Sequence, residues 1–462
     1  MNTPIADFCK TYAESDTARL HMPGHKGQGP LGVEAMDLTE IAGADSLYEA
    51  DGIIAESERN AASLFGTRST YYSCGGSSQS IKAMCLLALR NHAKTHFGKA
   101  AILAGRNAHK SFVQAAQLLQ FDVRWLPSEE DAFSLCRCTI SPKGLEQRLK
   151  LLEDEEVPLA AVYVTSPDYL GNILDIRGLA DVAHAHGVPL LVDNAHGAYL
   201  KFLPEDRHPI TLGADACADS AHKTLPVLTG GGYLHVSQNA PEGFEETARD
   251  AMCLFGSTSP SYLILQSLDL CNAWLENESR ASFSKAVERT EDLRQALREE
   301  GLELLGNEPL KVTVDCRSSL QEPGTVFADR LRDFSIECEY ADRDTVVLMF
   351  SPFSRPEDFQ QVELAVHMLM QVERVAQSTK LIGSRPPVSL SALLPTVITK
   401  PYEVLTRPTE EVPVEEALGR IATDVRIGCP PAVLPVVPGE KIDRGVVDIL
   451  NYYGIKTISV LK

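Results

Sequence analysis

The segment DSAHKTLPVLTGGG, residues 219–232, contains a single lysine, Lys223, which follows His222 and precedes a stretch without acidic residues. A lysine that forms a Schiff base must be at least partly neutral, and an apolar or cation-adjacent setting lowers the pKa of its amine towards that state. Because a solvated surface lysine needs no such setting, the segment predicts a nucleophilic lysine at position 223.

Asp193 is the only acidic residue of PLLVDNAHG, residues 189–197. A buried carboxylate needs a cationic partner or strong hydrogen-bond donors. The protonated pyridine nitrogen of pyridoxal phosphate (PLP) is such a partner, and an aspartate facing it keeps the cofactor an effective electron sink. Considered alone, Asp193 could equally well cap a helix.

A glycine- and serine-rich stretch, YYSCGGSSQSIKAM, could hold the phosphate of such a cofactor. Its residues Gly75, Gly76, Ser77 and Ser78 stand directly before a helix-like run. Glycine lets the backbone approach closely, and the amides at a helix N-terminus favour an anion. GGSS is more often a plain turn, but neither GxxxxGK[ST] nor a well-placed GxGxxG competes with it. The order of these features along the chain favours a PLP site.

Three apolar runs predict the strands that position these residues: KAAILAG (99–105), LAAVYVTSP (159–167) and VPLLVDNAHG (188–197). Between the last two, DIRGLADVAHAHG repeats apolar residues at helical spacing and ends at a glycine. A strand–helix–strand unit predicts a parallel sheet, in which ligands gather at the carboxyl ends of the strands. We expect four polar side chains at this edge, namely His109, Tyr169, Asp193 and His196. His109 could stack there on a flat ring, or simply be a core or loop histidine.

The remaining chain predicts further domains. Residues 261–300 are helical in pattern, LKVTVDC and DTVVLMFSP predict strands, and PEDFQQVELAVHMLMQVERVAQ and VEEALGRIATDV predict helices. Residues 378–412 are rich in Pro, Ser and Thr and predict a linker. The predicted division is an N-terminal arm (1–45), a large domain (46–275), a small α/β domain (276–377), the linker (378–412) and a C-terminal domain (413–462).

Composition excludes some classes of function. The 462 residues carry 43 basic and 63 acidic side chains, a formal net charge of −20, which argues against nucleic-acid binding. The eleven cysteines lack metal-ligand spacing, so we predict no metal site and expect free thiols in a reducing cytoplasm. No secretory signal is recognised, and no apolar stretch reaches the roughly 18 residues that span a bilayer.

Several stretches together resemble the Orn/Lys/Arg decarboxylase family in its short bacterial form. They are LHMPGHKGQGP (20–30), DLTEIAGADSL (37–47), GRNAHKS (105–111), TSPDYLG (165–171), VDNAHGAYL (192–200), SAHKTLPVLT (220–229), STSPSYLILQSLD (257–269), EEALGRIATDV and PPAVLPVVPGE. The resemblance covers nearly the whole chain. It implies an α/β PLP-dependent transferase fold of the aspartate-aminotransferase type, with a mostly parallel sheet in the large domain, a small α/β domain and a C-terminal decarboxylase-type domain.

The resemblance also implies roles for individual residues. Lys223 would carry the cofactor, Asp193 would face its pyridine nitrogen, His109 would stack on its ring, and His196 would lie near Asp193 or the ring hydroxyl. The positions that would hold the phosphate or flank the lysine are Gly76, Ser77, Ser78, Ser220 and His222. Ser257 and Thr258 match a segment that reaches the phosphate in the neighbouring subunit, which implies at least a homodimer.

Candidate substrate contacts are His25 and Lys26 in HMPGHKG, at the active-site entrance, together with Tyr169. For the distal cation of the substrate the candidates are Glu440, Asp45 and Glu40.

Two departures from the family pattern bear on the substrate. Where the family commonly has DEAH, this chain has Asn194 in second place, which removes an acid beside the site. Where the family usually has PPGIP, this chain reads PPAVLP over residues 430–435, so a glycine able to adopt positive φ is missing or shifted.

The implied reaction is decarboxylation of arginine, lysine or ornithine to an amine and CO2, in polyamine metabolism, with Lys223 or His222 returning a proton to Cα. The same lysine and aspartate would also serve an aminotransferase, lyase or racemase. Arg317 could then grip the α-carboxylate, or it could be a surface charge at a strand end. A third hypothesis is a regulatory subunit that has lost catalytic activity. The presence of Lys223, Asp193 and His109 argues against it.

Overall fold

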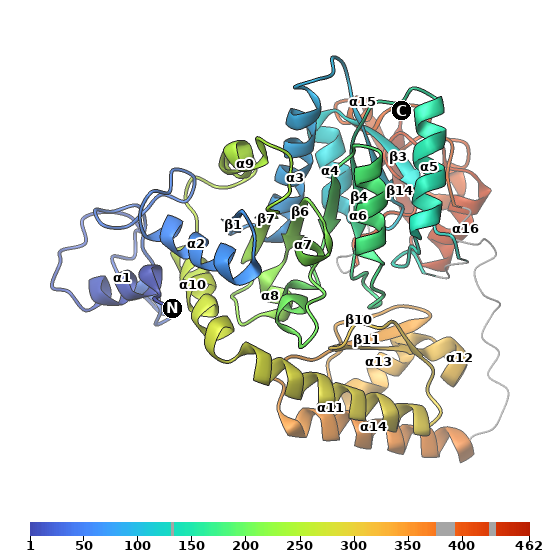
Figure 1. Ribbon diagram of the computed structural model, residues 1–462. Helices are drawn as coiled ribbons and strands as arrows, with labels where there is room; N and C mark the ends of the chain where they lie inside the picture. The colour runs from blue at the N-terminus through green and yellow to red at the C-terminus, as the bar shows by residue number, and fades with distance from the viewer. Residues whose placement is uncertain (131–133, 376–392, 425–430) are drawn as a thin grey trace. The chain divides into compact units, whose positions relative to one another are not determined.

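The computed structural model describes residues 1–130, 134–375, 393–424 and 431–462 (Figure 1). The chain divides into two compact units that interleave along the sequence. The first unit comprises Met1–Ala104, Leu145–Ser166 and Asp175–Arg280, and the second comprises Gly105–Gly144, Pro167–Leu174 and Ala281–Lys462. The large domain predicted as one continuous stretch is therefore interrupted twice by segments of the second unit.

The first unit is built around a mostly parallel sheet, as predicted, with the strand order β1-β7-β6-β5-β4-β2. Strands β2, β4, β5 and β6 pair in parallel, and β7 runs antiparallel to both of its neighbours. The strands are β1 (Ser69–Ser73), β2 (Ala101–Gly105), β4 (Leu159–Thr165), β5 (Leu190–Asp193), β6 (Ala216–Asp219) and β7 (Gly232–Val236).

The helices of this unit lie before, between and after these strands in the chain. They are α1 (Pro4–Ala13), α2 (Ile53–Phe65), α3 (Gly76–His92), α5 (Pro142–Asp154), α6 (Ile176–Ala185), α7 (Pro209–Leu212), α8 (Ala221–Thr224), α9 (Phe244–Cys253) and α10 (Tyr262–Asn277), with the 3-10 helices η1 (Glu34–Met36) and η2 (Ala198–Phe202). The predicted β4-α6-β5 unit is present. Asp175 caps α6 by accepting from the Gly178 amide, and Gly187 follows the helix at φ +69°, where glycine is not strained.

The second unit contains two smaller sheets. The first is antiparallel in the order β10-β11-β9-β8 and packs with α11, α13 and α14 around an apolar core; the second has the order β12-β14-β13. The elements of this unit are α4 (Lys110–Leu119), β3 (Asp122–Leu126), α11 (Ser279–Glu299), β8 (Leu304–Leu305), β9 (Lys311–Asp315), α12 (Cys316–Leu320), α13 (Gly324–Asp333), β10 (Tyr340–Ala341), β11 (Thr345–Met349), α14 (Pro356–Val375), α15 (Pro401–Val404), β12 (Thr409–Pro413), η4 (Val414–Ala417), β13 (Ala422–Asp424), α16 (Arg444–Tyr452) and β14 (Thr457–Leu461).

Two expectations for the C-terminal region differ from the structure. The helix predicted over VEEALGRIATDV is absent: this stretch forms the short η4 and then β13, because Gly419 turns the chain at φ +82° and β14 offers a partner strand. Of the predicted linker, 378–392 lies outside the described residues. The part from 393 onwards contains α15 and β12 and belongs to the folded C-terminal region.

Two general features of the described residues concern their helices and their cysteines. None of their helices is both long and apolar enough to cross a membrane. The described cysteines are all free thiols, and Cys429 lies outside the described residues.

Candidate active site

Lys223 lies in α8, a single helical turn that follows β6 directly. Its Nζ atom is 3.1 Å from Nε2 of His196, in the turn that follows β5. Since β5 and β6 are neighbouring parallel strands, the fold brings together two residues that are 27 positions apart. A nitrogen of an imidazole at this distance can exchange a proton with the lysine amine.

Asp193 ends β5 and is only 2% exposed. Its carboxylate accepts hydrogen bonds from the Tyr163 hydroxyl (3.1 Å) and from the Ala195 amide (3.2 Å). Burial raises the pKa of Asp193, and the positive charge of Lys223 opposes that rise. A buried carboxylate of this kind is suited to a cationic partner such as a protonated ring nitrogen.

The phosphate cradle predicted from GGSS has the expected local form. Gly76 begins the 17-residue helix α3 with φ +62°, a conformation that favours glycine. The hydroxyls of Ser220 and Ser77 are 2.8 Å apart, so α3 and the turn before Lys223 meet here. A Cβ atom at Gly232 would lie 2.7 Å from the Asp219 carbonyl oxygen and 3.1 Å from the Gly76 carbonyl carbon, so close packing at this point requires glycine.

His222 forms a hydrogen bond through one ring nitrogen in this arrangement. Burial lowers the pKa of His222. Its Nδ1 is 2.9 Å from the Gly231 carbonyl, and because a carbonyl can only accept, Nδ1 carries a proton and Nε2 is the nitrogen that can gain or lose one. The predicted role of His222 as a general acid would therefore require it first to gain a proton.

The residues of the first unit fit a PLP molecule. A helix N-terminus with glycine and serine, which leaves its first amides without acceptors inside the helix, suits the phosphate. A buried carboxylate of raised pKa suits a protonated ring nitrogen, and a half-buried lysine suits the aldehyde.

Several predicted site residues belong to the second unit. His109 caps α4, its Nδ1 accepting from the Ser111 amide, and its backbone forms a bridge with Val433. The hydroxyl of Tyr169 donates to Glu339. The structure thus brings Lys223 together with groups of its own unit, whereas the predicted roles of His109 and Tyr169 remain predictions.

The structure argues against a substrate role for Glu440. This residue is 2% exposed, its Oε2 is ion-paired with Arg106 at 3.0 Å, and it also accepts from the Val437 amide. Asp45 is likewise occupied, because its carboxylate accepts from backbone amides at the start of α2, among them Gly52 and Ile54. Glu40 is exposed and accepts from Thr39.

The N-terminal candidates are near the surface. His25 Nε2 lies 3.2 Å from Asp37, and Lys26 is exposed and donates to the His21 carbonyl. Ser257 and Thr258 are also exposed. Their predicted contacts with a substrate or a second subunit therefore remain predictions.

Arg317, the candidate for binding a substrate α-carboxylate as in an aminotransferase, interacts with other groups of the protein instead. It lies in α12, 2.9 Å from Asp344, and donates to the Tyr452 hydroxyl. It is neither a surface charge nor a group open to a substrate carboxylate, so the structure does not support the aminotransferase alternative at this position.

The altered C-terminal loop keeps the backbone shape expected of the family glycine. Ala432, which stands where PPGIP has glycine, has φ +51°, and its carbonyl accepts from the Lys110 amide at 2.8 Å. Pro430 lies outside the described residues. The missing glycine is thus replaced by an alanine in a left-handed conformation.

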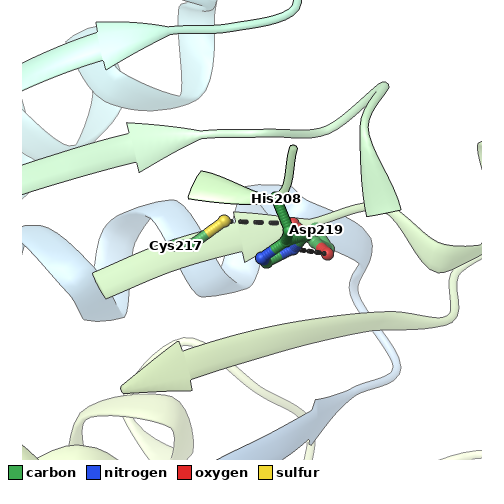
Figure 2. A group of neighbouring side chains, drawn as sticks. All are labelled: His208, Cys217 and Asp219. Atoms are coloured by element: carbon green, nitrogen blue, oxygen red, sulfur yellow. Dashed lines mark hydrogen bonds and ion pairs between the residues drawn. The ribbon is translucent and has the colours of Figure 1, made fainter. Parts of the chain in front are cut away.

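Sequence reasoning missed a buried polar cluster on β6, which Figure 2 shows in part. Asp219 is 3.0 Å from Nε2 of His208 and 3.3 Å from Nε2 of His235, and it accepts from Cys217 and Asn194. Burial acts to raise the pKa of Asp219, but the two histidines outweigh it and the pKa is lowered. The signal in the sequence was alternation along β6, which puts Cys217 and Asp219 on one face.

The cluster has the residue types of a metal site, but its hydrogen bonds explain it without an ion. His208 caps α7 and accepts the Ile210 amide at Nδ1, so the ring proton is on Nε2, aimed at Asp219. A metal at Nε2 would require that proton on Nδ1, where the amide already points. Tyr163, the donor to Asp193, was also missed, although it lies two residues before Thr165, the register partner of Asp193.

Comparison with known proteins relates the chain to a family. The sequence model of the Orn/Lys/Arg decarboxylase major domain matches residues 3–315, and that of the family's C-terminal domain matches residues 394–457. The chain is 28% identical to the uncharacterized protein YaaO of Bacillus subtilis (strain 168), over 98% of this chain and 94% of that one. It is 27% identical to an arginine decarboxylase of Bacillus anthracis, over 97% of this chain and 92% of that one.

Among solved structures, the fold is similar to that of lysine decarboxylase A from Pseudomonas aeruginosa. The TM-score is 0.80 at 18% identity, covering 99% of this chain and 80% of that one. The α/β architecture with a mostly parallel sheet is thus the one predicted. With its major and C-terminal domains both matched, the chain belongs to the Orn/Lys/Arg decarboxylase family and is an amino-acid decarboxylase of that family.

Proposed function

We propose that this protein binds PLP and uses it to decarboxylate a basic amino acid (arginine, lysine or ornithine) to CO2 and the corresponding amine, in the polyamine metabolism of the cytoplasm. The observation that carries the proposal is the placement of Lys223 Nζ 3.1 Å from His196, on the strand next to the one that ends at buried Asp193. The free thiols of the described cysteines support a reducing compartment.

Each residue of the site has a task in this reaction. When bound, PLP supplies an electron sink for the charge left on Cα as CO2 departs. Lys223 would hold the cofactor, Asp193 its ring nitrogen, and Ser77 and Ser220 with the N-terminus of α3 its phosphate. Preorganised charges of this kind stabilise a developing charge without reorganising during the reaction.

Return of a proton to Cα is assigned to Lys223 rather than His222. Burial lowers the pKa of His222, which disfavours its protonated form, and its Nδ1 proton is directed to the Gly231 carbonyl. The amine of Lys223 can donate from Nζ and can be reprotonated by His196, which lies within hydrogen-bond reach.

Arginine is the first substrate to test. The arginine decarboxylases similar to this chain align over 95–97% of it at 27% identity, whereas the constitutive lysine decarboxylase of Escherichia coli is 22% identical. The three amino acids share a distal cation, so a binding site for one can admit the others with lower efficiency.

The test is to supply purified protein and PLP with each amino acid and to measure CO2 and the amine product. Lys223→Ala should abolish both the visible absorption band of the bound cofactor and its fixation by borohydride. Lys150→Ala, a change of an exposed lysine in the same unit, should leave both intact. Keto acid formation without CO2 would contradict the proposal, as would a borohydride label on another residue.

We further propose that the active form is a homodimer. Ser257 and Thr258 follow the family motif and are exposed in the isolated chain, as residues that complete a neighbouring subunit's site would be.

A further inference from the structure

Asn194 replaces the family's usual glutamate, and its side chain is used within the fold. Its Nδ2 donates to Oδ1 of Asp219 at 2.8 Å, and both side chains are fully buried. The amide of Asn194 also donates to the Ala218 carbonyl at 3.0 Å. The ends of β5 and β6 are therefore joined here by a main-chain and a side-chain hydrogen bond.

The two residues of this bond stand next to the cofactor site in the sequence. Asn194 follows Asp193 and begins the turn that carries His196, a turn closed by the Gly197 amide donating to the Asn194 carbonyl. Asp219 ends β6 and precedes Ser220, the residue that leads into the turn with Lys223. The bond therefore joins the two segments whose spacing decides whether His196 reaches Lys223.

Neither side chain of the bond can act on the cofactor by contact. In β5 and β6, Asp193 and Ala218 are register partners, so the neighbouring positions 194 and 219 face the opposite side of the pleated sheet. The acid expected from DEAH thus has not been lost from beside the cofactor. Position 194 faces the buried cluster, where Asp219 supplies the carboxylate.

Asp219 is well suited to serve as an anchor. His208, His235 and Cys217 lie around its carboxylate in addition to Asn194, at 3.0, 3.3 and 3.1 Å. Several donors converging on one buried, charged acceptor fix its position more firmly than a single bond would.

We propose that the Asn194–Asp219 hydrogen bond is a clasp that holds the Asp193–His196 turn in place against the Lys223 turn, so that Asn194 and Asp219 are positioning residues for the cofactor. The proposal rests on the PLP site of the proposed function. It does not depend on which amino acid is the substrate.

The test uses Asn194→Asp, Asp219→Asn and the double variant with both changes. Asn194→Asp sets two carboxylates against each other and Asp219→Asn removes the charged acceptor, whereas the double variant restores an acid–amide pair with the roles exchanged. Each single variant should bind PLP at least about tenfold more weakly. Each should also shift the pH at which the two absorption bands of bound PLP interconvert. The double variant should recover both properties towards wild type.

Asn272→Asp is the matched control. Asn272 is a buried asparagine of the same unit that donates to the Tyr72 hydroxyl rather than to Asp219. Asn272→Asp should lower the urea concentration at the midpoint of unfolding without altering the absorption bands of bound PLP. Asn194→Ala, which removes one donor and adds no charge, serves if the charged variants fail to fold, and it should weaken PLP binding severalfold.

Single variants that lose stability like Asn272→Asp but keep wild-type PLP affinity and absorption would overturn the clasp. A double variant that binds PLP no more tightly than Asp219→Asn would also overturn the clasp. A wild-type protein that does not bind PLP would instead refute the proposed function. A wild-type protein that binds PLP without decarboxylating a basic amino acid would refute the activity alone and leave the test of the clasp valid.

Discussion

Glu440 was a candidate partner for the distal cation of the substrate. Its carboxylate is instead paired with Arg106, 334 residues away in the chain. The carboxylate of Asp45 is likewise occupied, because it accepts hydrogen bonds from the amides at the start of α2. Lys223 and Asp193 were proposed from their own segments, but the side chains that the structure places beside them, His196 and Tyr163, lie 27 and 30 residues away. A sequence motif can thus single out a residue, but the fold decides which distant partners surround it.

Replacement of Glu440 by Gln is expected to affect stability rather than substrate affinity. Removing one partner of a buried ion pair leaves the Arg106 charge uncompensated, which costs about 3 kcal/mol or more. Urea unfolding should show this loss, while KM for arginine, lysine or ornithine should stay within about twofold of wild type. The exposed Glu416 is the control, since Glu416→Gln should change neither. A large rise in KM without loss of stability would restore the substrate role of Glu440.

Replacement of Ala432 by Gly is expected to stabilise the protein. Alanine in the left-handed region, here at φ +51°, carries a steric cost of about 1–2 kcal/mol that glycine does not have. Part of this gain is offset by the greater freedom of glycine in the unfolded chain, so a net gain of about 1 kcal/mol is expected. Ala273→Gly, inside α10, should lower stability by about 1 kcal/mol. A loss of stability on Ala432→Gly would contradict the strain argument.

Among elements, the strands and helices of the β4-α6-β5 unit followed directly from hydrophobic periodicity. The failure at VEEALGRIATDV has a physical cause, because β13 forms only by pairing with β14, more than thirty residues later. The helical periodicity of this short stretch was outweighed by that pairing. The helix that begins at Gly76 was expected from the sequence. The close approach of Gly232 to Gly76 was not, because Gly232 belongs to β7, in a distant part of the chain.

His186 should make the contact between α5 and the end of α6 dependent on pH. Its two ring nitrogens lie 2.6 Å from Glu153 and 2.9 Å from Glu146, and these carboxylates raise the pKa of His186 above its ordinary 6.5. A pKa raised by folding adds stability that is complete below the unfolded value and is lost as pH rises through the folded value. The difference in unfolding free energy between wild type and His186→Gln should therefore be largest below pH 6.5 and shrink at alkaline pH. An equal difference at all pH values would refute this.

For the whole molecule, the interleaving of the chain was not predicted, and the proposed order of large, small and C-terminal parts stays a prediction. The motifs indicated large, small and C-terminal parts in sequence. The structure groups Gly105–Gly144 with the C-terminal part of the chain, through contacts such as Arg106 with Glu440 and the bridge of His109 with Val433. Such contacts leave no local pattern in either segment.

Shared sites in a homodimer predict complementation between two inactive variants. In the proposed homodimer, Lys223→Ala would lack the cofactor lysine, and Thr258→Glu would set a negative charge against the phosphate of the neighbouring subunit's cofactor, which would repel it. When the two variants are unfolded and refolded together, half of the dimers are mixed and each mixed dimer has one intact site, so about a quarter of wild-type activity should return. Each variant refolded alone should remain inactive. Absence of recovery in a sample that sedimentation shows to be dimeric would refute sharing, as would full activity of Thr258→Glu alone.

The grouping of Gly105–Gly144 with the end of the chain also bears on synthesis. During translation this segment leaves the ribosome long before residues 393–462, which supply Glu440, Val433 and the Tyr453 hydroxyl that Leu135 contacts. At about 5–20 residues per second, it waits tens of seconds for these partners. Over that interval α4 lacks α15, the helix near the end of the chain that packs against it, and we expect the apolar face of α4 to bind chaperones on the nascent polypeptide.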